Sequence, residues 1–78
     1  MEHELIHVDP NVMRGRPVIR GTRITVDLIL EKLGAGETIA DLLDAYPHLT
    51  EAAIRAALLF GAEAVRMQAI YPLPEAAG

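Results

Sequence analysis

The chain has 78 residues, 51% of them hydrophobic, with a formal net charge of −4 and no cysteine. This length allows one small domain with a marginal core and excludes a multidomain enzyme. The lack of cysteine excludes a disulfide framework and thiolate chemistry, and it favours a reducing compartment. The apolar runs are too short to cross a bilayer and the N-terminus lacks a signal-peptide pattern, so we expect a cytoplasmic protein with no membrane contact.

Charge is segregated along the chain. Residues 1–10 and 27–78 are each acidic on balance, whereas residues 11–26 contain four arginines and no acid. This basic segment consists of Arg14, Arg16, Arg20 and Arg23. A planar guanidinium binds phosphate or carboxylate in a bidentate manner, so the segment is a candidate surface for an anionic partner.

The first 25 residues carry strand and turn signals. Residues 4–8 are β-branched and apolar and stop at Asp9-Pro10, which predicts a short strand. Residues 17–25 predict a tight β-hairpin with Gly21 and Thr22 at the centre of a type II′ turn, because that turn prefers glycine in first place.

The hairpin register decides which side chains meet. It places Ile19 opposite Ile24 and Arg20 opposite Arg23. Like charges across a strand pair are destabilising, so this arrangement favours an anion bound between the two arginines. Two alternatives remain open: both side chains extend into solvent, or they pair with acids of the helices that follow.

Three helices are predicted beyond the hairpin, because apolar residues recur at i, i+3, i+4 and i+7. They cover about residues 26–33, 39–46 and 51–67. Thr25, Thr38 and Thr50 are the expected N-caps, and Thr38 with Asp41 resembles a capping box. Pro47 ends the second helix, since the residue before proline disfavours helical backbone.

The short connection between the last two helices predicts a helix-turn-helix arrangement. We therefore expect a mainly α fold: a three-helix, helix-turn-helix-like core with a short N-terminal strand and β-hairpin. A single domain would cover residues 1–70, with the β segment at 1–25, and residues 71–78 would form an extended tail.

The third helix is apolar on more than one side. Its expected buried stripe is Ile54, Ala57, Leu58, Gly61 and Val65. A second apolar set is the candidate homodimer interface: Leu59, Phe60, Ala64 and Met67. Gly61 would permit close helix approach. The alternative is that the N-terminal strand and hairpin cover this second set within one chain.

No constellation of residues predicts catalysis. His3 and His7, four residues apart in a strand, would lie about 13 Å apart, beyond the reach of one metal ion. No nucleophile triad or phosphate-binding glycine loop has a suitable spacing. We expect no enzymatic activity, no metal, no cofactor and no small-molecule substrate.

One segment carries a family likeness. The run from Gly15 to Ile24, GRPVIRGTRI, followed by Val26, resembles the signature of the bacterial domain of unknown function 433 family. Blocks at residues 36–39, 46–50 and 54–58 are similar to that family's second half, and the likeness covers roughly residues 5–66. The resemblance implies a small helix-turn-helix protein, often considered antitoxin-like and found beside a nuclease of the PIN type.

Two anionic partners suit the arginines. One is the carboxylate cluster of a PIN-like nuclease toxin, where a guanidinium would displace or distort the metal ion. The other is operator DNA, whose phosphates bind arginine. In the first two turns of the third helix only Arg55 could read guanine, while Glu51 could accept from cytosine but would be repelled by phosphate, or the two could pair with each other. We expect an antitoxin-like regulator; the alternatives are an autonomous DNA-binding regulator and an oligomeric module that binds no DNA.

Overall fold

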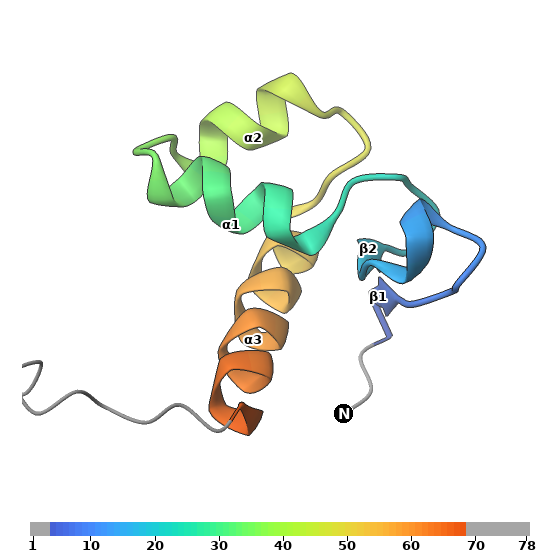
Figure 1. Ribbon diagram of the computed structural model, residues 1–78. Helices are drawn as coiled ribbons and strands as arrows, with labels where there is room; N and C mark the ends of the chain where they lie inside the picture. Colours follow the sequence, from blue (N-terminus) through green and yellow to red (C-terminus); the bar gives the residue numbers. More distant parts are fainter. Residues whose placement is uncertain (1–3, 69–78) are drawn as a thin grey trace, which may run out of the picture.

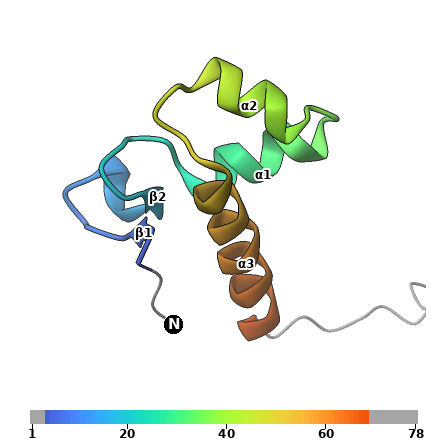
Figure 2. The ribbon, with the colours of Figure 1, turned by 180° about the vertical axis from the view of Figure 1, so that it is seen from behind.

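The computed structural model describes residues 4–68. The elements in chain order are β1 (Ile6–His7), the 3-10 turn η1 (Met13–Gly15), β2 (Val18–Ile19), α1 (Val26–Gly34), α2 (Ile39–Ala45) and α3 (Glu51–Met67). α1 and α2 lie across one end of α3, and the two strands lie beside α3 (Figures 1 and 2). The mainly α fold with three helices and an N-terminal β segment is confirmed. The expected tail and the expected domain end at residue 70 lie outside the described residues.

The β segment is built around β2. β1 pairs with it antiparallel, with Ile6 opposite Ile19. On the other side Val18 forms a bridge to Thr25, and the Ile19 N–H donates to the Ile24 carbonyl over 2.9 Å. The predicted pairing of Ile19 with Ile24 is therefore confirmed, and the predicted N-terminal strand adds a second partner to the same short strand.

The predicted type II′ turn is wrong. The Thr22 N–H donates to the Ile19 carbonyl over 2.9 Å, so Arg20 and Gly21 are the two central residues. Gly21 has φ +82°, the value that a type II turn requires at its third position. The Thr22 hydroxyl secures this register, because it donates to the Ile19 carbonyl and accepts from the Ile24 N–H. Arg20 consequently lies in the turn and not in a strand pair with Arg23.

All three helices begin at the predicted threonines. The hydroxyls of Thr25, Thr38 and Thr50 each accept a hydrogen bond from the backbone N–H three residues later. The capping box is complete, because the Asp41 carboxylate accepts from the Thr38 N–H over 2.8 Å. Caps of this kind contribute about 1 kcal/mol each, which matters for a helix as short as α2 with seven residues.

The core lies where the three helices meet β2. Its largest fully buried side chains are Ile29, Leu42, Ile54 and Val18, one from each of these elements. Gly61 allows α3 to approach α1, since a Cβ there would lie 2.7 Å from Leu30 Cδ1. The close approach expected at Gly61 therefore occurs within one chain.

Candidate functional site

Three of the five candidate arginines are held by groups of their own chain. Arg16 pairs with Asp27, with Nη2 and Oδ2 2.7 Å apart. Arg20 turns back onto β1, where its Nε donates to the Glu4 carbonyl over 2.7 Å and its Nη2 to the Ile6 carbonyl over 3.4 Å. These contacts tie the turn and the start of α1 to the β segment, so both side chains have a structural role.

Arg55 is also engaged. Its Nη2 lies 2.7 Å from Glu51 Oε2, one turn earlier on α3. The pairing that the sequence left open is therefore formed. It places a carboxylate beside the one cation that the first two turns of α3 would offer to a base edge, and that carboxylate would repel an approaching phosphate.

Arg14 and Arg23 differ from the other three. Both side chains are exposed, and neither forms a hydrogen bond or an ion pair with any residue between 4 and 68. An unpaired guanidinium keeps all five donors for a partner. Within the basic segment, these two side chains form what we call the open arginine pair.

Arg14 lies in a strained turn. Met13, Arg14 and Gly15 have φ values of +50°, +58° and +81°, so two non-glycine residues adopt left-handed backbone in succession. The Gly15 N–H donates to the Val12 carbonyl and the Arg16 N–H to the Met13 carbonyl, which hold η1 in this shape. None of the η1 residues is buried, so the strain does not serve the core. Backbone strain outside the core is typical of sites that bind.

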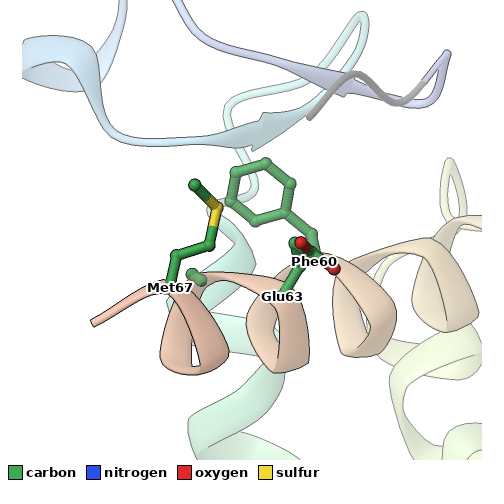
Figure 3. A pocket seen from close by; sticks show the side chains of 4 residues that line it. Phe60, Glu63 and Met67 are labelled. Carbon is green, nitrogen blue, oxygen red and sulfur yellow. The ribbon is translucent and has the colours of Figure 1, made fainter. Parts of the chain in front are cut away.

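The candidate dimer residues lie on two different sides of α3. Leu59 is 63% exposed. Phe60 is half-buried and packs against the core, and Figure 3 shows Phe60 and Met67 pointing from α3 toward the N-terminal strands. With Glu63 and Ala64 they line a shallow hollow of about 160 Å³. The β segment thus lies beside Phe60, whereas Leu59, Ala64 and Met67 are exposed, so the alternative of cover within one chain describes Phe60 alone.

Two residues assigned to the buried stripe of α3 are exposed. Leu58 is 40% and Val65 58% exposed, whereas Ile54 and Ala57 of the same stripe are fully buried. The reason is the phase of the stripe: the buried residues of α3 also include Ala53 and Ala56, so the covered side is centred away from Leu58 and Val65. The apolar periodicity did not show which apolar side of α3 the rest of the chain covers.

The described residues contain no group of three His, Cys, Asp or Glu side chains that could hold a metal ion. His7 Nε2 lies 3.7 Å from Asp9 Oδ2, and His7 Nδ1 lies 3.5 Å from Arg20 Nη1; both contacts are exposed. His3 lies outside the described residues.

The pKa of Asp41 is below its usual range. The larger cause is the hydrogen bond that its carboxylate accepts from the Thr38 backbone N–H, and the smaller cause is its hydrogen bond with the Thr38 side chain. No helix between residues 4 and 68 is long and apolar enough to span a bilayer.

Comparisons with known proteins agree with the fold. Residues 6–60 match the model of a family described as "Protein of unknown function (DUF433)". The crystal structure of a DUF433 member protein from Anabaena variabilis ATCC 29413 is similar, with a TM-score of 0.74 and 32% identity over 76% of this chain and 58% of that chain.

A curated relative is similarly uninformative about activity. The uncharacterized protein y4eO of Sinorhizobium fredii (strain NBRC 101917 / NGR234) is 36% identical over 57 residues, which is 73% of this chain and 26% of the relative. The chain therefore spans about a quarter of this relative and just over half of the crystallised one. The matched family segment includes η1, the hairpin and the first ten residues of α3.

Proposed function

Because the chain belongs to the DUF433 family, which has no described activity, we propose from its own surface that it is an antitoxin-like regulator. It binds a PIN-type nuclease in the cytoplasm through the open arginine pair, Arg14 and Arg23, and it acts as a homodimer. The single observation that carries the proposal is the pair itself: two exposed guanidinium groups without a partner among residues 4–68 of an acidic chain.

The composition of η1 supports a protein partner. Met13 is 37% exposed beside Arg14, and methionine and arginine are both enriched at protein interfaces. A guanidinium that meets a carboxylate in a water-poor interface forms a short, charge-assisted pair. A nuclease with clustered carboxylates presents such groups, and a guanidinium among them competes with the metal ion for the same oxygens.

Operator DNA is the second candidate, favoured by the order of α2 and α3 joined by a short connection. The first two turns of α3 argue against base reading, because Arg55 is paired with Glu51 and the other exposed side chain there, Ala52, is small. DNA contact would then depend on the open arginine pair and phosphate, which makes binding steeply dependent on salt.

A tagged pull-down from the native host tests the function, with co-purifying protein and nucleic acid both identified. The wild-type chain should retain a PIN-type nuclease at stoichiometric yield, and Arg14→Ala/Arg23→Ala should lose it. Arg16→Ala/Lys32→Ala is the matched control, since it removes the same charge from two cations that already pair with Asp27 and Glu37.

Equal capture of the nuclease by both double variants would contradict the assigned surface. Recovery of one specific DNA without a nuclease would support the autonomous regulator. Recovery of neither would leave an oligomeric interaction module and remove the role given to the arginines.

A further inference from the structure

One side of α3 has no cover among residues 4–68. We call it the outer face; its exposed residues are Glu51, Ala52, Arg55, Leu58, Leu59, Ala62, Val65 and Arg66. At 3.6 residues per turn these positions share one side of the helix. The buried residues of α3 lie on another side, which α1 and the strands cover (Figures 1 and 2).

The middle of the outer face is apolar. Leu59 and Val65 are 63% and 58% exposed, and Leu58 is 40% exposed. Ala52 and Ala62 flank the leucines and are small enough to admit another helix. Charged residues occur at both ends of the face, with Glu51 at the N-terminal end and Arg66 at the C-terminal end.

When the outer face of one α3 is placed against the outer face of a second, antiparallel α3, the side chains that meet are complementary. When two copies of α3 run antiparallel and cross between Leu58 and Leu59, the two leucines meet. Ala52 then lies opposite Val65 of the second copy. One charge pair agrees with this register, because Glu51 lies opposite Arg66, while Arg55 lies opposite Ala62. Glu51 and Arg66 also pair with Arg55 and Glu63 of their own helix, and both ion pairs are solvent-exposed enough to share a second partner. A parallel pairing would instead place each end charge against its own kind.

We propose that the outer face of α3 binds the same face of a second copy, antiparallel about the midpoint between Leu58 and Leu59. Such a two-fold contact is isologous, so each pairing occurs twice. The inference assigns a surface to the homodimer in the proposed function and does not depend on a nuclease or on DNA.

The contact is small and partly electrostatic. A helix of 17 residues is about 25 Å long, and one exposed side of it buries less than the roughly 800 Å² per partner of a standard interface. The dimer should therefore exchange with monomer in the micromolar range. In the dimer the outer face is covered, so α3 is not available to enter a major groove.

Charge reversal tests both the surface and the orientation. In Glu51→Lys each Lys meets Arg66 of the other copy, and in Arg66→Glu each Glu meets Glu51. Sedimentation velocity at low salt should show that each single variant dimerises roughly tenfold more weakly than wild type, since two attractive pairs become repulsive.

The decisive measurement is sedimentation velocity of an equimolar mixture of the two single variants. The mixed dimer contains one Lys–Glu pair and one Arg–Glu pair, so it should form with near wild-type affinity although neither variant dimerises well alone. Every change within α3 is identical in the separate and the mixed samples, so loss of an intrahelical pair cannot produce the rescue.

Leu59→Glu and Met67→Glu extend the test to the apolar centre. Both place a carboxylate at a highly exposed position of α3, but only Leu59 belongs to the outer face. Leu59→Glu should be monomeric and Met67→Glu should retain the dimer, with circular dichroism verifying the helix content of both. A monomeric wild type up to near-millimolar concentration, or a mixture without rescue, overturns the proposal. Loss of nuclease capture with the dimer intact would contradict the proposed function alone.

Discussion

Residue by residue, the turn at Met13 and Arg14 is the most expensive conformation among residues 4–68. Left-handed backbone brings Cβ close to the following carbonyl, at a cost of about 1 kcal/mol for each non-glycine residue. Neither side chain contributes to the core, and the hydrogen bonds of η1 are formed by backbone atoms that any residue supplies. The fold therefore gives these two side chains no role, and the proposed partner contact would supply one.

Met13→Gly should raise the free energy of unfolding by about 0.5–1 kcal/mol, because glycine adopts φ +50° without the steric cost. The measurement is urea denaturation followed by circular dichroism. Arg16→Gly is the control: Arg16 has φ −74° and an ion pair to Asp27, so glycine there should destabilise.

A Met13→Gly variant less stable than wild type would show that the Met13 side chain supports the fold after all. If it is more stable and also binds the nuclease less well, the strain is linked to binding. Greater stability with unchanged binding would assign recognition to Arg14 and Arg23 alone.

At the scale of the elements, the fold was predictable where local chemistry decides it. Each helix begins at the threonine that the capping rules indicate, and α2 carries the complete capping box. The hairpin register was predictable too, but the turn type was not, because the Thr22 hydroxyl moves the turn one residue toward the N-terminus. The hydrogen bonds of the Thr22 hydroxyl to the neighbouring backbone thus outweigh the preference of glycine for the first central position of a type II′ turn.

The capping box of α2 makes stability depend on acid. The pKa of Asp41 is lowered in the folded chain, so its contribution is present above the unfolded pKa near 3.8 and is lost as pH falls through the lower folded value. The denaturation midpoint of the wild type should therefore decline in this range, and that of Asp41→Asn should decline less steeply.

Thr38→Ala separates the two causes of this pKa shift. It removes the hydroxyl but keeps the Thr38 backbone N–H, which is the larger cause, so part of the acid-dependent decline should remain at a lower overall stability. Urea midpoints measured from neutral pH to pH 3 provide the comparison. Identical slopes for wild type and Asp41→Asn would contradict the assignment.

At the scale of the molecule, the sequence locates a basic segment but does not show which of its arginines are free of contacts within residues 4–68. Arg55 pairs with Glu51, four residues earlier in the same helix. The partners of Arg16 and Arg20 lie 11 and 16 residues away, in α1 and at the start of β1, so these two contacts depend on the tertiary fold. Composition counts these charges as equal, whereas tertiary contacts divide them into structural and open ones. The exposed side of α3 was hidden for the same reason, since apolar residues occur on several sides of this helix and only tertiary packing decides which side is covered.

Association and folding should be linked in a chain this small. If the outer face of α3 is covered by a second copy only in the folded state, mass action raises the melting temperature with protein concentration. We expect a rise of a few degrees between micromolar and near-millimolar wild type, because one kcal/mol shifts the midpoint of a short domain by about 4–8 °C. Leu59→Glu should melt at one temperature across that range, whereas Met67→Glu should retain the dependence. A concentration-independent midpoint for the wild type would mean that the marginal core of the monomer is sufficient and that the apolar residues of the outer face serve a different partner.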